Sequence, residues 1–208
     1  SATTDIRYAI DPKRLLQVSS AYSFEGPDTD VNALYGSSLP LHGFLKMKNG
    51  FSKNVLNYTQ RISKQNALIL EVKDYYNNLK QDFNVAPSVY KLNSNAADMQ
   101  SGLWKKHSWQ GTASIYGLSK TTKYTTFLSV AGSRNNFNSL LETDSANNSI
   151  SSLANNFLYT RKNISQGATM DSRMGSWKIL LSYSLSWLSQ DYSNKISNKS
   201  IAGKRLYF

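Results

Sequence analysis

The chain contains no cysteine. It can therefore form no disulfide, no thiolate metal site and no iron–sulfur cluster, and it has no thiol nucleophile. Charged residues are also scarce, at 18% of the 208 residues, whereas an average soluble domain has about a quarter. No stretch approaches the roughly 18 consecutive apolar residues of a transmembrane helix. These shortages exclude a helical membrane protein and all cysteine chemistry.

Basic residues outnumber acidic ones by 24 to 13, which gives a formal net charge of +11. Such a charge favours nucleic acid or another anionic surface as a partner. The cations are nevertheless spread along the chain in short groups, with no long block of like charge. Neighbours such as Trp104 and Lys105 would point to opposite faces of a strand, which argues against a basic, aromatic nucleic-acid face. We therefore expect no nucleic-acid partner.

Apolar and polar residues alternate along most of the chain, a pattern typical of β-strands with one apolar face. The clearest example runs from Trp177 to Leu188. Its apolar positions are Trp177, Ile179, Leu181, Tyr183, Leu185 and Trp187. Three serines, at 182, 184 and 186, lie between them. The sequence therefore predicts an all-β fold.

Connections between the alternating segments differ in length. Short turns are predicted near residues 12, 65, 121 and 173. Long polar loops are predicted near residues 26–51, 81–107 and 135–155. Compact soluble domains rarely have several loops above about 12–15 residues, whereas outer-membrane barrels combine short turns on one side with long loops on the other. We therefore expect an antiparallel transmembrane β-barrel with about eight strands in this chain. Residues 1–208 would form one barrel domain or a segment of a larger barrel.

The alternating segment is expected to span a bacterial outer membrane. Strands cross a bilayer only in closed barrels, because every backbone polar group must find a partner within the protein. Trp177 and Trp187 would lie at the two membrane interfaces, with Ile179, Leu181, Tyr183 and Leu185 facing lipid. Charged residues on strands, namely Arg61, Arg161 and Lys162, would have to face the lumen or lie near an interface.

Membrane lipid or lipopolysaccharide is the partner expected for several cations. The candidates for contact with anionic headgroups are Lys46, Lys48, Lys105 and Lys106. Other barrel or lipoprotein subunits are further possible partners. A soluble exported β-sandwich that binds glycan or protein through polar, aromatic loops is the alternative, since its strands would alternate in the same way.

No catalytic, metal or cofactor site is predicted. The chain has two histidines, His42 and His107, and neither has a second ligand at metal-binding spacing. His107 and Ser108 would point to opposite strand faces and could not act as a pair. Phosphate-binding loops and nucleophile elbows are both absent from the sequence. We therefore expect a protein that is not an enzyme.

Two stretches resemble strand–turn–strand units of TonB-dependent receptor barrels, particularly those of Bacteroidetes-type bacteria. One runs from Asp5 to Leu16, and the other joins Tyr58–Ile62 to Tyr75–Leu79. The resemblance implies a barrel that imports a solute. Receptors of this family have about 22 strands, and the chain shows neither their plug domain nor their N-terminal energy-coupling box. It would then be a small complete barrel or a portion of a large one.

Overall fold

The computed structural model describes residues 1–35, 39–86, 98–143 and 151–207. Within these ranges the side chains are described except at 29–42, 85–86, 143 and 151–153. No helix long and apolar enough to cross a membrane occurs in the described part of the chain.

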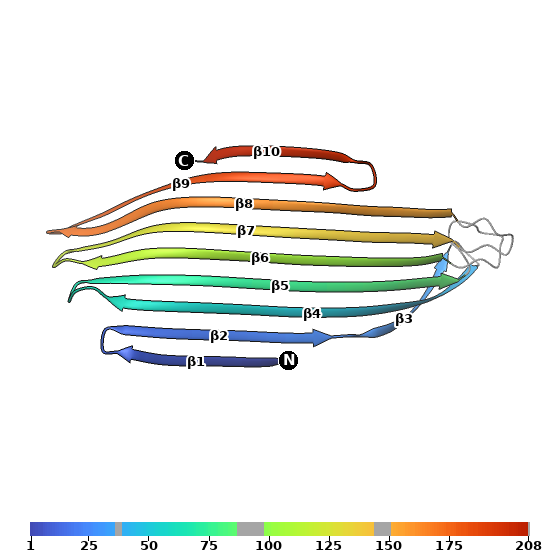
Figure 1. The fold of residues 1–208 in the computed structure, drawn as a ribbon, viewed down its shortest axis with the longest axis horizontal. Coiled ribbons are helices and arrows are strands. Elements are labelled where there is room, and N and C mark those ends of the chain that lie inside the picture. The colour runs from blue at the N-terminus through green and yellow to red at the C-terminus, as the bar shows by residue number, and fades with distance from the viewer. Residues whose placement is uncertain (36–38, 87–97, 144–150, 208) are drawn as a thin grey trace.

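The described residues form ten β-strands, which confirms the expected all-β class. They are β1 (Ala2–Asp11), β2 (Arg14–Glu25), β3 (Asp28–Tyr35), β4 (Leu39–Arg61), β5 (Asn66–Ala86), β6 (Asp98–Leu118), β7 (Thr122–Thr143), β8 (Ser151–Met174), β9 (Trp177–Asn194) and β10 (Lys199–Tyr207). All belong to one antiparallel sheet in the order β1-β2-β4-β5-β6-β7-β8-β9-β10, with β3 paired to β4 (Figure 1).

The predicted short turns are confirmed. They join β1 to β2, β4 to β5, β6 to β7 and β8 to β9, and all four lie at the same end of the sheet, on the left in Figure 1. In the β8–β9 turn, Gly175 has a φ of 63°, a left-handed conformation that glycine adopts without a steric penalty. A further turn, between β9 and β10, was not predicted.

The predicted long loops are mostly strand, and there are ten strands rather than about eight. Residues 26–51 contain β3 and the first half of β4, while β5 to β8 extend into the other two ranges. At about 3.3 Å per residue, a strand of the length of β4 reaches about 75 Å, far beyond the roughly 30 Å of a bilayer core. The polar composition of these ranges predicts loops, but in the structure strand pairing extends through them.

The two faces of the sheet differ sharply in chemistry. Residues paired across antiparallel strands point to the same side, so one row can be followed from β1 to β10. One such row contains Ile6, Val18, Leu56, Val72, Gly111, Val130, Ile164, Trp187 and Leu206. The adjacent row, on the other side, contains Arg7, Gln17, Asn57, Glu71, Thr112, Ser129, Ser165, Ser186 and Tyr207. We call these sides the apolar face and the polar face.

Neither face is covered by a second layer of protein. Leu188 is the one fully buried hydrophobic residue among those described. The accessible surface is 14582 Å², whereas a compact monomer of 23.3 kDa would expose about 9,700 Å². The alternative of a β-sandwich is therefore wrong for the described residues, because a sandwich buries a core between two sheets.

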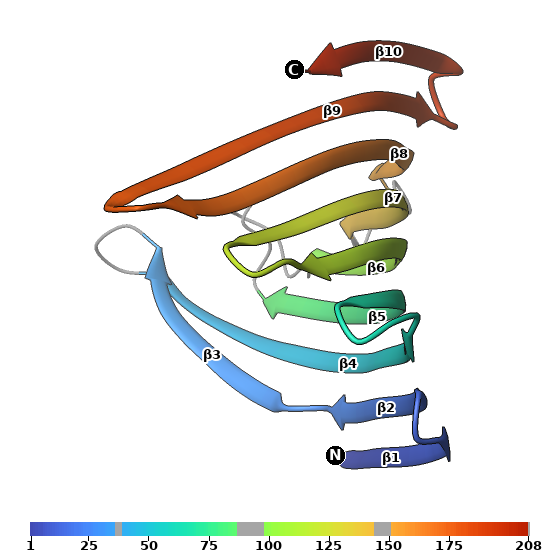
Figure 2. The same cartoon turned by 90° about the vertical axis from the view of Figure 1, so that its left-hand side faces the viewer.

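Within the described residues the sheet is open. β1 pairs only with β2, and β10 pairs only with β9. Figure 2 shows these two strands at opposite ends of a curved sheet. One edge of each strand therefore presents backbone N–H and C=O groups without partners in this sheet.

Candidate functional site: an apolar face and a cationic hollow

The apolar residues of β9 match the thickness of an outer membrane. All six predicted lipid-facing residues, from Trp177 to Trp187, lie on the apolar face. At about 3.4 Å per residue, the two tryptophans lie about 34 Å apart along the strand. A tilt of about 40° reduces this to about 26 Å along the membrane normal, close to the roughly 25 Å apolar band of outer-membrane barrels.

The apolar band crosses the sheet diagonally. Its aromatic boundary toward the long connections is Tyr22 in β2 and Tyr76 in β5, which lie in one cross-strand row. The boundary lies two residues closer to the turns at Trp109 in β6, and a further two residues closer at Trp187 in β9. Tilted barrel strands require such a stagger, because a horizontal membrane cuts each successive strand at a different residue.

The three charged strand residues singled out in the sequence lie outside the apolar band. Arg61 and Arg161 are on the polar face, as expected if that face lines a lumen. Lys162 is on the apolar face, but in the row of Asp74 and Trp109, at the aromatic boundary. None of the three cations therefore lies within the apolar band itself.

Four lysines were expected to contact anionic lipid, and the structure separates one from the others. Lys46, Lys48 and Lys105 lie on the apolar face, beyond the aromatic boundary. Lys106 is on the polar face, with its ammonium 5.7 Å from the centre of the Tyr75 ring. This corrects the prediction for Lys106, because consecutive strand residues point to opposite sides.

His107 belongs to the aromatic boundary of the apolar face. Its Nε2 lies 2.6 Å from Oδ1 of Asp74, and its ring packs edge-on against Tyr76 with centroids 6.5 Å apart. Ser108 points to the polar face, which agrees with the expectation that it cannot pair with His107. The His42 side chain lies outside the described residues. Among those that are described, no three potential metal ligands gather in one place.

The polar face carries a hydrogen-bonded surface and, beside it, a hollow of about 460 Å³. Thr112 and Gln110 both contact the Ser129 hydroxyl, at 3.1 and 3.2 Å. The hollow lies toward the long connections from there. Four cations line it, namely Lys53, Lys73, Lys106 and Arg161. Sequence analysis missed this group, because its members are far apart in the chain and only strand register brings them together.

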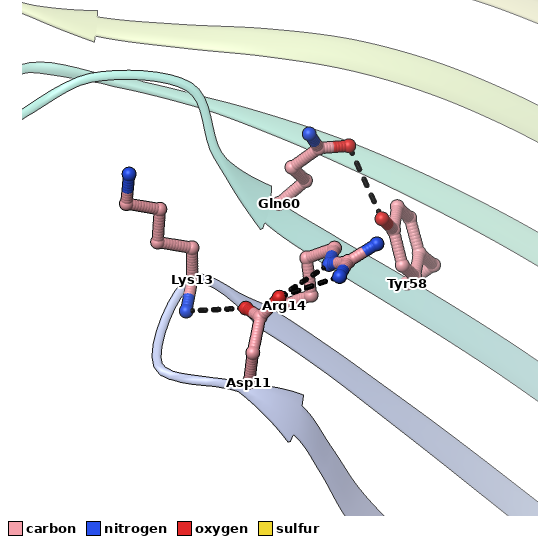
Figure 3. A network of polar contacts seen from close by, with 5 residues as sticks. All are labelled: Asp11, Lys13, Arg14, Tyr58 and Gln60. Carbon is pink, nitrogen blue, oxygen red and sulfur yellow. Dashed lines mark hydrogen bonds and ion pairs between the residues drawn. The ribbon is translucent and has the colours of Figure 1, made fainter.

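One ion pair organises the turn between β1 and β2 (Figure 3). Asp11 Oδ2 accepts hydrogen bonds from Arg14 Nε at 2.7 Å and Nη2 at 2.6 Å, and Oδ1 accepts one from the Lys13 amide at 2.8 Å. The hydrogen bonds from Arg14, followed by the one from Lys13, hold the pKa of Asp11 below its usual value. The contact fixes the turn end of the first hairpin.

Comparison with solved structures identifies the fold. The structure is similar to that of the siderophore receptor PiuA from Acinetobacter baumannii, with a TM-score of 0.54, 12% identity and coverage of 98% of this chain. The ferric citrate transporter FecA in its unliganded form gives a TM-score of 0.49 and 8% identity over 99% of this chain. The chain spans 37% of the length of each. No protein-family model and no curated protein sequence matches it. The chain therefore has a fold similar to that of part of the siderophore receptor.

Proposed function

We propose that the chain forms part of the wall of a bacterial outer-membrane β-barrel that takes part in the import of a solute. The observation that carries the proposal is the pair of adjacent rows across the sheet, one apolar and one polar. Apolar side chains exposed on this scale require a cover, and lipid is the cover that fits a band of this height. The import role rests on analogy of fold, and the likeness to Bacteroidetes-type receptors rests on the sequence stretches Asp5–Leu16, Tyr58–Ile62 and Tyr75–Leu79.

The open edges favour a segment of a larger barrel over a complete small one. Ile6 in β1 and Leu206 in β10 belong to the apolar row, so both edges run through the membrane band. An unpaired backbone group in hydrocarbon costs several kcal/mol. The free edges of β1 and β10 must therefore pair with further strands before the wall can sit in a bilayer.

Electrophoresis of unheated and boiled samples tests the proposal. The full-length gene product should fractionate with outer membranes, require detergent for extraction, and migrate differently before and after boiling, because a closed barrel resists detergent until it is heated. Residues 1–208 expressed alone should show no such shift, since their edges are unpaired. A full-length product that is soluble without detergent would contradict the membrane location. A heat-dependent change in migration for residues 1–208 alone would contradict the proposal that they are a segment of a larger barrel.

Lipopolysaccharide is the lipid that we propose for the lysines on the apolar face. Lys48 and Lys80 are directly paired across β4 and β5, and like charges in that position destabilise a sheet unless an anion lies between them. Lys105 lies on the next strand, two residues closer to the band. Lys80 has one carboxylate partner, Asp82, at 2.9 Å. These lysines are positively charged and lie beyond the aromatic boundary of the band, where the headgroup phosphates of a bilayer would lie.

Replacing Lys48 and Lys105 together with glutamine should reduce the lipopolysaccharide that co-purifies with the full-length protein at least threefold. The matched control replaces Lys53 and Lys106, which have the same charge but lie on the polar face, and it should leave the bound lipid unchanged. Lipid content can be measured by mass spectrometry of the extracted protein. If the two double variants retain equal amounts of lipopolysaccharide, the lysines on the apolar face do not bind it.

A further inference from the structure

The cationic hollow on the polar face is a candidate binding site because of its charge. Lys53 in β4 and Arg161 in β8 lie in one cross-strand row, on opposite sides of Ser108 and Ser133. Neighbouring strands are about 4.8 Å apart, so the two strands that carry these cations are separated by about 19 Å. Ser108 and Ser133 form the floor of the hollow between longer side chains, and this difference in length creates the hollow.

Most of this charge has no partner. Lys73 Nζ is paired with Glu71 Oε1 at 2.7 Å. Lys53, Lys106 and Arg161 make no ion pair with any residue that the structure describes. Asp74 also borders the hollow, but its carboxylate is held by His107 on the apolar face. The hollow therefore has a net positive charge that protein carboxylates do not neutralise.

An aromatic group lies beside the cations. Tyr75 is in the row between Lys53 and Ser108, its ring packs edge-on against Phe51 with centroids 5.1 Å apart, and Lys106 lies over it. These contacts hold the ring and the Lys106 side chain in place. Ser108, Ser133 and Asn163 add hydrogen-bonding groups to the lining. The hollow thus combines fixed cations with neutral polar groups.

We propose that this hollow binds a small solute with two or more carboxylate or phosphate groups on its way through the barrel. The inference rests on the proposed function, since it takes the polar face to be a lumen. Two separated cations on opposite sides match anionic groups at two ends of one molecule, and the serines and Asn163 match its hydroxyl or ether oxygens. A singly charged or neutral solute would leave most of the cations unpaired.

Calorimetric titration of the detergent-purified full-length protein tests the inference, with citrate, pyrophosphate and sucrose as probes. Citrate or pyrophosphate should bind at least tenfold more tightly than sucrose, and more weakly as salt rises, because salt screens exposed charges. Replacing Lys53 and Arg161 together with glutamine should weaken that binding at least tenfold. The matched control replaces Lys120 and Lys123 with glutamine, near the β6–β7 turn, and should bind as the wild type does.

Two results would overturn the inference. One is binding of both polyanions no tighter than that of sucrose, which would also be seen if a protein segment fills the hollow. The other is unchanged polyanion binding after replacement of Lys53 and Arg161. Each protein is first tested for the heat-dependent gel shift. A shifted protein that binds no polyanion contradicts only the anion site, whereas a soluble protein without a shift contradicts the membrane barrel itself.

Discussion

Replacing Leu181 with arginine is expected to cost about 2–4 kcal/mol of folding free energy in a bilayer. The Leu181 side chain is 57% exposed on the apolar face, and its cross-strand neighbours there are Met170 and, beyond it, Tyr124. It lies between Trp177 and Trp187, well inside the predicted band. A guanidinium at this depth would have no polar partner and would have to draw water into the hydrocarbon.

Ser184 provides the matched control, because it lies on the same strand but on the polar face, opposite Gly167. Its replacement with arginine should cost less than about 1 kcal/mol, since surface substitutions are usually within about 0.5 kcal/mol. Urea titration of the full-length protein refolded into phospholipid vesicles measures both costs. Equal losses for the two variants would show that β9 does not present its apolar residues to lipid.

Replacing Gly167 with valine is expected to destabilise the sheet by about 3 kcal/mol, at the upper end of ordinary overpacking. A Cβ at this position would lie 2.6 Å from the carbonyl oxygen of Tyr183 and 2.8 Å from the Phe127 ring. The ring can rotate away, but the carbonyl belongs to the backbone of β9 and cannot move without disturbing the strand pairing. Valine itself favours strands, so the loss would come from the contact.

A comparison with Gly132 separates crowding by a backbone carbonyl from crowding by an aromatic ring. The three atoms nearest to a Cβ there all belong to the indole of Trp109, at 2.6 to 2.8 Å, and this residue is 43% exposed. Replacing Trp109 with alanine should therefore remove most of the cost of Gly132→Val, whereas replacing Phe127 with alanine should leave most of the cost of Gly167→Val. Double-mutant cycles by urea unfolding measure both couplings. Full rescue of Gly167→Val by Phe127→Ala would show that the backbone contact is unimportant.

Alternation and turn residues were sufficient to predict the class of fold and the central part of each hairpin. Trp177 to Trp187 alternates because its odd-numbered residues lie on the apolar face and its even-numbered residues lie on the polar face. In the first half of β4 and at the ends of β5 to β8, by contrast, the many polar residues predict loops. Strand length at these ends is set by pairing with neighbouring strands, which a single segment does not reveal.

The cationic hollow could not be predicted from the sequence for a related reason. Lys53 and Arg161 line the same hollow only through the register of four successive strand pairs, and a shift of one residue in any pair would move a side chain to the opposite face. The error at Lys106 has the same origin. Grouping it with Lys105 treated adjacency in the chain as adjacency in space, which a strand does not provide.

The free edges of β1 and β10 have a consequence for biogenesis. A sheet with bare edges is stable neither in water, where its apolar face attracts other chains, nor in hydrocarbon, where its backbone lacks partners. If the chain is part of a barrel wall, as proposed, neighbouring strands must be in place before the wall enters a bilayer, so insertion and strand pairing at both edges would have to occur together.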